Sequence, residues 1–188
     1  DIDDLRVFTK DCKVVITKVD SKTFIGKNII HAAVFKKKDK RTIYNMIYKD
    51  GKSGNTMIKR FAVKGVTRNK AYSLTKSEKG SKVRYFTANP NGEAEVIKVN
   101  LRAKPKLKKL SFDFDFSSLA IKGRNSRGNI LSKNTIKNIV QREEGVSTLG
   151  ARSIWYDDTV RRLNTDERGD FVGAFKGDEK ILSILSSG

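Results

Sequence analysis

Two carboxylates two residues apart are the first candidates for chemistry in this sequence. Asp113 and Asp115 alternate with aromatic residues in Phe112-Asp113-Phe114-Asp115-Phe116. In a strand both carboxylates lie on one face, where they could act as acid and base or hold a metal ion. No third ligand is near in the sequence. We therefore favour a strand with one polar and one buried aromatic face, and keep a stand-alone metal-dependent enzyme using Asp113 and Asp115 as an alternative.

The other reactive side chains have structural explanations. Gly51-Lys52-Ser53 resembles the end of a phosphate-binding loop, but that motif requires a glycine five residues before Gly51, where this chain has Met46. We therefore expect a hairpin loop. The sequence holds one histidine, His31, in an apolar run typical of a strand or core, and one cysteine, Cys12, at a predicted turn. A single cysteine excludes an intramolecular disulfide. Trp155 is predicted to be a core residue.

Positive charge is the dominant feature of the composition. The 188 residues include 40 Lys and Arg against 21 Asp and Glu, a formal net charge of +19. Residues 21–140 hold 29 basic and 7 acidic side chains, whereas residues 141–188 hold 7 basic and 9 acidic. A long cationic stretch of this kind points to a polyanionic partner. No apolar run approaches the roughly 20 residues that a membrane span needs, and no signal peptide is recognisable. The start at Asp1 leads us to expect a fragment or a processed product.

The cations gather in four clusters, and we predict that these bind DNA phosphates around one perimeter. The predicted DNA-binding residues are Lys36, Lys37, Lys38, Lys40 and Arg41 in the first cluster; Arg68, Lys70, Lys76, Lys79 and Lys82 in the second; Lys104, Lys106, Lys108 and Lys109 in the third; and Lys122, Arg124 and Arg127 in the fourth. One such cluster is usually a solvated surface. Four in succession indicate a shared binding surface.

The elements that must position these cations are strands, because the hydropathy alternates with period two between Gly, Asn, Asp and Pro turns. The pattern predicts an all-β fold of successive hairpins, with turns near residues 11, 51, 91 and 126. The paired segments are 5–9 with 14–17, 43–48 with 56–61, 83–87 with 94–99, and 119–122 with 129–131, and a fifth hairpin begins at 181–188. Residues 66–71 and 135–143 are the best short-helix candidates, although both could be strands. A repeated strand-turn-strand unit is typical of a propeller-like ring of four-stranded blades.

Several of these segments resemble one family. Asp4–Lys10 with Val14–Lys18, Tyr48–Asn55, Gly80–Val96 and Leu119–Asn129 are similar to the C-terminal domain of bacterial type IIA topoisomerase A subunits, as found in topoisomerase IV or DNA gyrase of the Bacteroidetes type. The resemblance implies a β-pinwheel over residues 1–188, complete or partial, with about four blades and a further one begun. In such a ring the blades exchange strands and DNA bends around a basic outer rim.

The resemblance also implies a division of labour within a larger enzyme. ATP and Mg²⁺ would act in other domains, so this chain is expected to have no cofactor, no metal and no catalytic residue of its own. Its implied partners are double-stranded DNA and, through the rest of the enzyme, the topoisomerase B subunit; a membrane is not expected. The implied location is cytoplasmic, at the nucleoid.

Two details refine this expectation. Gyrase A subunits carry a box reading Gln-Arg-Arg-Gly-Gly-Lys-Gly. The segment Gln141-Arg142-Glu143-Glu144-Gly145 matches the first five positions of this box only at their two ends and has two acidic residues between them. The difference favours a role like that of topoisomerase IV. The family's DNA-cleaving tyrosine follows an arginine, as in Arg84-Tyr85, but that dipeptide lies in a predicted strand of a different domain, and we assign it no catalysis.

The preferred hypothesis is a non-catalytic module that binds and bends DNA and presents it for strand passage. A propeller-like protein-interaction scaffold and the metal-dependent enzyme remain alternatives. DNA binding at moderate salt separates the scaffold from the module, and a nuclease assay with metal ions tests the enzyme.

Overall fold

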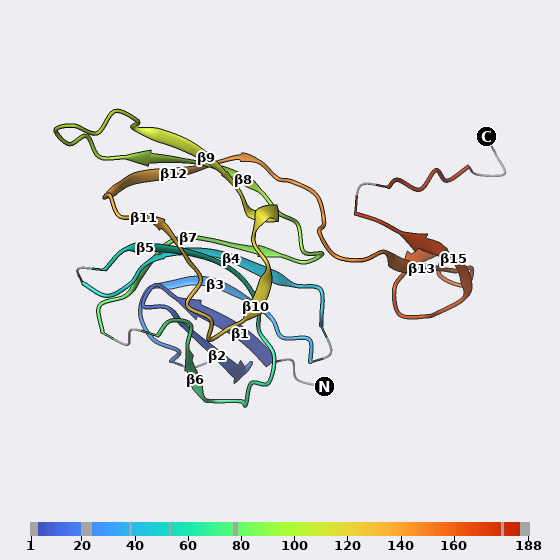
Figure 1. The fold of residues 1–188 in the computed structure, drawn as a ribbon. Coiled ribbons are helices and arrows are strands. Elements are labelled where there is room, and N and C mark those ends of the chain that lie inside the picture. Colours follow the sequence, from blue (N-terminus) through green and yellow to red (C-terminus); the bar gives the residue numbers. More distant parts are fainter. Residues whose placement is uncertain are drawn as a thin grey trace.

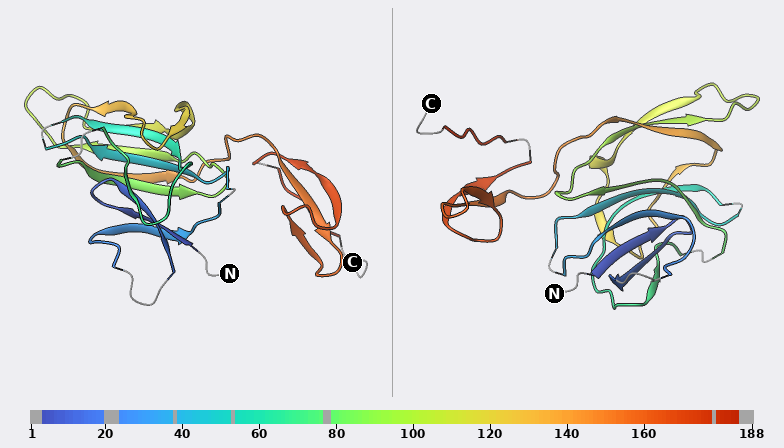
Figure 2. Two further views of the ribbon diagram at one scale, coloured as in Figure 1. Left: turned by 90° about the horizontal axis from the view of Figure 1, so that it is seen from below. Right: turned by 180° about the vertical axis from the view of Figure 1, so that it is seen from behind.

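The computed structural model describes residues 4–19, 24–37, 39–52, 54–76, 79–177 and 179–184. The described chain forms four small sheets, three of them stacked and the fourth set to one side (Figures 1 and 2). The strands are β1 (Asp4–Thr9), β2 (Lys13–Lys18), β3 (Ile29–Val34), β4 (Ile43–Lys49), β5 (Thr56–Ala62), β6 (Ala71–Ser73), β7 (Lys82–Asn89), β8 (Val96–Leu101), β9 (Ser111–Asp115), β10 (Ile121–Gly123), β11 (Asn129–Ser132), β12 (Ile136–Glu143), β13 (Arg152–Asp157), β14 (Arg162–Asn164) and β15 (Asp170–Phe175). A single 3₁₀ turn over Phe116–Ser118 is the one helical element in these ranges.

Every sheet is built on the same plan. Its centre is a pair of consecutive antiparallel strands, β1–β2, β4–β5, β8–β9 or β13–β14. A third strand returns to pair with the first of the two, as β3, β7, β12 and β15 do. The first two sheets also receive a strand from the unit that follows: β6 comes after β5 yet pairs with β2, and β10 comes after β9 yet pairs with β5. This exchange of strands between successive sheets confirms the all-β, pinwheel-type fold.

The exchange stops at the third sheet. By the same plan, a strand lying between β14 and β15 should pair with β9, but only residues 165–169 separate these two strands. The third sheet is therefore three-stranded, with the order β12-β8-β9, and so is the fourth, with the order β14-β13-β15. The prediction of four-stranded blades holds for the first sheet, β3-β1-β2-β6, whereas the second has five strands because β10 and β11 share one edge of β5.

Two of the four predicted hairpins are wrong. The turn at 89–92 is present, with the Gly92 amide donating to the Asn89 carbonyl over 3.1 Å, but β7 pairs with β4 whereas β8 pairs with β9 and β12. Strands β10 and β11 do not pair with each other, because both lie along β5, at Arg60–Ala62 and Thr56–Ile58. Alternating hydropathy identifies a strand but carries little information about which distant strand completes its sheet.

The structure also tests the other predictions of local structure. The hairpins at 5–17 and 43–61 are confirmed, including the loop character of Gly51 and Lys52. Neither helix candidate is helical, since 135–143 is almost entirely β12 and 66–71 is irregular chain leading into β6. Residues 181–184 form no strand, so the start of a fifth hairpin is wrong there, and 185–188 lie outside the described residues. Trp155 is only half-buried, against Phe171 in the small fourth sheet.

The second sheet is the centre of the molecule, because it is covered on both faces. In β4 and β5 every residue but the last is buried. Alternate side chains serve two cores: Tyr44, Met46 and Tyr48 pack against the first sheet, whereas Ile47 and Ile58 pack against the third. This explains the nearly continuous apolar sequence of β4, which a half-exposed strand would not need.

We predict that Phe8→Ala lowers the free energy of unfolding by about 3–5 kcal/mol, the usual loss for a large aromatic core residue. Phe8 is fully buried between the first two sheets, with its ring centroid 4.5 Å from that of Tyr44 and 4.8 Å from that of Phe86. The matched control is Phe24→Ala, because Phe24 is 82% exposed. Urea denaturation measures both variants, and equal losses would contradict this account of the core.

Candidate nucleic-acid interface

The central strand β5 carries a buried lysine that ties down a basic loop. Lys59 is 2% exposed, and its ammonium donates to three backbone carbonyls: Leu74 at 2.6 Å, Arg124 at 2.7 Å and Ser126 at 2.9 Å. It also lies over the Phe61 ring, 4.5 Å from the centroid. Burial lowers the pKa of Lys59 to about 7. The three carbonyls belong to the two segments that directly follow the exchanged strands β6 and β10, so one side chain holds both exchanges.

The neighbouring cation, Arg60, faces the opposite side of the same strand and is equally buried. Its guanidinium donates to Asn45 Oδ1 at 3.1 Å, to the Gly92 carbonyl at 2.8 Å and to Thr148 Oγ1 at 2.8 Å. Asn45 in turn donates to Glu95 Oε2 over 2.6 Å. Gly92 and Thr148 lie in the connections between successive sheets. Lys59 therefore fixes the exchanged segments and Arg60 fixes the connections.

The loop held by Lys59 spans Gly123–Gly128 and packs closely on β5. Gly128 has φ +83°, and a Cβ there would come within 2.3 Å of the Ile58 carbonyl oxygen, so no other residue fits without strain. Arg127 bonds the buried Asp50 carboxylate through Nε at 3.2 Å and Nη2 at 3.1 Å. Arg124 lies over the Tyr72 ring at 4.4 Å. Both arginines thus anchor the loop, although the Arg127 side chain is still 64% exposed.

A cationic groove crosses three sheets. Lys10, Lys82, Arg84 and Lys137 line a cavity of about 520 Å³, and no carboxylate among the described residues lines it. Lys10 follows β1 of the first sheet, Lys82 and Arg84 lie two apart on β7 of the second, and Lys137 lies on β12 of the third. We call this the three-sheet groove. The Arg84 guanidinium donates to the Ile136 carbonyl over 3.0 Å, which joins the second sheet to the third.

A second groove of one sign lies beside the loop held by Lys59. Lys64, Lys122 and Arg124 line a cavity of about 400 Å³, again without a carboxylate in the lining that the structure describes. The exposed ammonium groups of Lys64 and Lys122 can move to meet a ligand, whereas Arg124 is held by Tyr72 and by the Lys64 carbonyl. We call it the loop groove.

The predicted clusters do not occupy equivalent loops. Residues 36–41 connect β3 to β4, and residues 102–109 lie inside the β8–β9 hairpin. Only the clusters at 68–82 and 122–127 are equivalent, because each surrounds an exchanged strand, β6 or β10. That the four clusters share one perimeter and bind DNA stays a prediction.

The predicted DNA-binding cations differ in whether other residues of the chain hold their side chains. Arg68 forms a two-pronged ion pair with the buried Asp4, at 2.9 and 3.0 Å. Lys70 lies over Tyr72 at 5.5 Å. Arg41 donates to Asn91 Oδ1 and to the Gly150 carbonyl. The exposed lysines are Lys36, Lys37, Lys40, Lys76, Lys79, Lys82, Lys104, Lys106, Lys108, Lys109 and Lys122, and Lys38 lies outside the described residues.

Sequence reasoning missed Lys10, Lys64, Arg84 and Lys137 in the two grooves, and the buried Lys59. The only local signal is the spacing of Lys82 and Arg84, which places both on one face of a strand. The groove forms when strands from three sheets meet, so contiguous basic runs were a poor guide to it.

Asp115, His31 and Cys12 have structural roles, whereas Asp113 lies exposed on β9. Asp115 accepts the Ser117 amide at 2.7 Å and caps the 3₁₀ turn. His31 lies among the rings of Phe8, Tyr44 and Phe86, and burial lowers its pKa. Cys12 is fully buried, and this raises the pKa of its thiol to about 12. Within the described ranges, no three His, Cys, Asp or Glu side chains are grouped to hold a metal ion.

The exchanged strands and the cationic grooves define an all-β domain of pinwheel type. A family model described as the topoisomerase C-terminal domain of Bacteroidota matches residues 1–144. The chain belongs to this family, and the matched region ends where β12 ends. No curated protein matches the chain. No helix in the described part of the chain is long and apolar enough to cross a membrane.

We predict that the stability contribution of Lys59 rises with pH. Its folded pKa of about 7 lies below the ordinary lysine value of 10.5, so unfolding takes up a proton between these two pH values. The unfolding free energy of the wild type, minus that of Lys59→Met, should therefore increase by roughly 2–3 kcal/mol from pH 6 to pH 9. Urea denaturation at several pH values measures the difference.

The control for this experiment is Lys49→Met, which removes an exposed lysine from the partner strand β4. Its difference from the wild type should stay flat over the same range. A flat difference for Lys59→Met as well would show that the Lys59 ammonium is not held as a buried charge.

Proposed function

We propose that this topoisomerase C-terminal domain binds duplex DNA through its cationic grooves. The observation that carries the proposal is the three-sheet groove, where four cations from three sheets converge on one cavity whose described lining holds no carboxylate. Concentrating like charge in this way is unfavourable for the protein alone and becomes favourable when an anion fills the groove. A duplex presents one phosphate charge per ≈ 1.7 Å of its axis.

The chemistry of the grooves suits the DNA backbone rather than the bases. Lys10, Lys82 and Lys137 are flexible ammonium groups, which neutralise phosphates but do not distinguish base edges. Binding should therefore depend little on sequence and strongly on salt. The loop groove adds Lys64 and Lys122 as a second site of the same kind. A duplex that touches more than one groove has to follow the curvature of the sheets, so we propose that the domain bends the DNA it binds.

Membership of the topoisomerase C-terminal domain family supports a role within a larger enzyme. We propose that the chain has no turnover of its own and presents a DNA segment for strand passage. The cleavage chemistry, ATP, Mg²⁺ and the B subunit belong to other parts of the assembly, and the enzyme acts in the cytoplasm at the nucleoid. The protein-scaffold alternative has less support because four cations converge on the three-sheet groove, and the metal-enzyme alternative because Asp115 serves as a cap.

We further propose a topoisomerase IV type of role rather than a gyrase type. Gln141, Arg142 and Glu143 are exposed on β12, and Glu144 follows them. Glu143 thus stands where the gyrase box has its second arginine and Glu144 where it has its first glycine, and the two carboxylates would repel a wrapped duplex.

The first prediction is a charge-specific loss of affinity. The triple variant Lys10→Gln, Lys82→Gln and Lys137→Gln should bind a random duplex more weakly, and the slope of log K against log salt should become shallower by about 2–3. Fluorescence anisotropy between 50 and 200 mM salt measures both quantities. The matched control removes three exposed cations elsewhere: Arg161, Arg162 and Lys176. If the control variant lost as much affinity and slope, net charge rather than the groove would explain binding.

The second prediction concerns DNA topology. Relaxed circular DNA incubated with the domain and a nicking-closing enzyme should show only a modest change in linking number, because no gyrase-type box is present. Gel electrophoresis resolves the topoisomers. A large change for each bound domain would refute the topoisomerase IV type of role while leaving DNA binding intact.

A further inference from the structure

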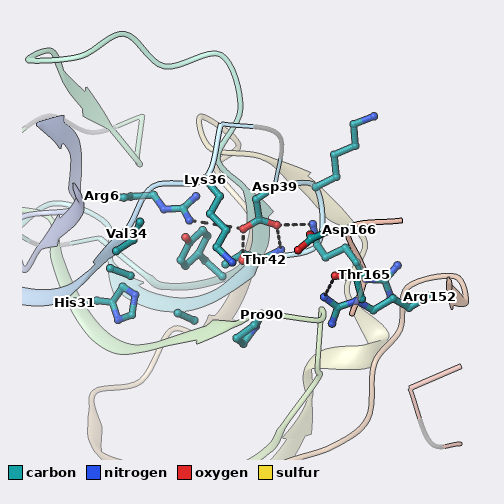
Figure 3. A pocket seen from close by; sticks show the side chains of 15 residues that line it. Arg6, His31, Val34, Lys36, Asp39, Thr42, Pro90, Arg152, Thr165 and Asp166 are labelled. Carbon is teal, nitrogen blue, oxygen red and sulfur yellow. Dashed lines mark hydrogen bonds and ion pairs between the residues drawn. The ribbon is translucent and has the colours of Figure 1, made fainter. Parts of the chain in front are cut away.

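A third cavity differs from the two grooves because buried donors face it. It measures about 600 Å³ and lies between the first sheet, the connection 36–42 and the fourth sheet (Figure 3). Arg6 and His31 line it from the first sheet, and Arg152 and Thr165 from the fourth. The cavity is therefore bounded by segments more than 100 residues apart in the sequence.

Two buried donors in its lining lack an acceptor. Arg6 is 4% exposed and Tyr44 is fully buried, and Arg6 Nε and the Tyr44 hydroxyl have no hydrogen-bond partner among the described residues. By contrast, the hydroxyl of Tyr48, four residues along the same strand, donates to the Arg127 carbonyl at 2.6 Å. Buried donors are nearly always paired, so Arg6 and Tyr44 indicate that an acceptor belongs in this cavity.

The nearby carboxylate does not supply that acceptor. Asp39 Oδ2 lies 3.9 Å from Arg6 Nη2, beyond hydrogen-bond distance. Its oxygens are already engaged: Oδ1 accepts the amides of Arg41 and Thr42 at 2.9 and 3.0 Å, and Oδ2 accepts the Thr42 hydroxyl. Burial alone would raise the pKa of Asp39, but these bonds hold it below its ordinary value. Asp39 thus remains a fixed anion that orients the 36–42 connection.

The charge of the lining favours an anion. Five cations line the cavity against two carboxylates, Asp39 and Asp166. The cations are Arg6, Lys36, Lys40, Arg41 and Arg152. Arg41 and Arg152 already donate to Gly150 and Thr165, but Lys36 and Lys40 are exposed and can turn inward. His31 adds no charge near neutral pH, because burial and the Arg6 guanidinium both lower its pKa.

We propose that this cavity binds a single phosphate group. Converging guanidinium, ammonium and hydroxyl donors match an anion with several acceptor oxygens, and the volume is within the range of small-ligand sites. The phosphate group could belong to a free small molecule or to the DNA backbone. The inference does not depend on DNA binding at the other grooves, so each can fail without the other.

The test is titration of the full 188-residue chain with inorganic phosphate, with sodium chloride of equal ionic strength as the reference. Calorimetry should show saturable binding of one phosphate per chain. In ¹H–¹⁵N spectra the Arg6 Nε–H signal should shift with the same saturation. Tyr44→Phe, which removes one buried hydroxyl, and the pair Lys36→Gln with Lys40→Gln should each weaken binding about tenfold. The control pair, Lys176→Gln with Lys180→Gln, removes two exposed lysines that line neither this cavity nor the two grooves, and it should leave phosphate binding unchanged.

Duplex DNA then distinguishes the two sources. If the cavity takes a backbone phosphate, inorganic phosphate should displace DNA beyond its ionic-strength effect, and the Lys36 and Lys40 variant should lose affinity for DNA as well. If it takes a free phosphate compound, that variant should bind DNA as the wild type does. Absence of saturable phosphate binding, or equal binding by wild type, Tyr44→Phe and the lysine pair, would overturn the proposal.

Discussion

The structure depends on two adjacent cations buried in the middle of β5. A buried charge is costly unless it is fully hydrogen-bonded, so Lys59 and Arg60 require acceptors on opposite faces of the second sheet. The backbone carbonyls that they find belong to other parts of the chain: those of Leu74, Arg124 and Ser126 for Lys59, and those of Gly92 and Glu93 for Arg60. Two side chains thereby set the positions of both exchanged segments and of the connection to the third sheet.

This arrangement links the fold to the proposed function. The loop that Lys59 holds carries Arg124, and the strand β7 that pairs with β4 carries Lys82 and Arg84. Arg124 therefore lies on backbone that a buried cation holds, whereas Lys82 and Arg84 are positioned by the pairing of β7 with the central strand β4. The two kinds of positive charge have opposite requirements: those on β5 are satisfied within the protein, whereas Lys10, Lys82 and Lys137 remain exposed. The regular exchange of strands between sheets stops at the third sheet, which has only three strands. The family match ends close to this sheet, at residue 144.

The sequence predicts where the strands lie better than it predicts which strands pair with one another. Local turns close the hairpins at 5–17 and 43–61, so alternation together with Gly51 was sufficient to predict them. The pairing of β7 with β4 is decided by burial of the second sheet on both faces, and no local pattern in the sequence indicates it.

The prediction of the site residues had the same limit, because local patterns do not show which distant residues meet. Lys59 and Arg60 look like surface cations in a hydropathy pattern, although the apolar residues on both sides of them, Ile58 and Phe61, hint at a strand buried on two faces. The three-sheet groove combines cations from three sheets, so a search for basic runs found only Lys82 there, together with Lys122 and Arg124 of the loop groove.

The account's central claim is that exposed lysines of the three-sheet groove contact DNA phosphates. Lysine modification rates, measured by mass spectrometry with and without a saturating duplex, test it residue by residue. The claim predicts strong protection of Lys10, Lys82 and Lys137 by DNA, with little change at Lys176 and Lys180 beyond the fourth sheet. Equal protection of all five lysines, or protection confined to Lys176 and Lys180, would contradict it.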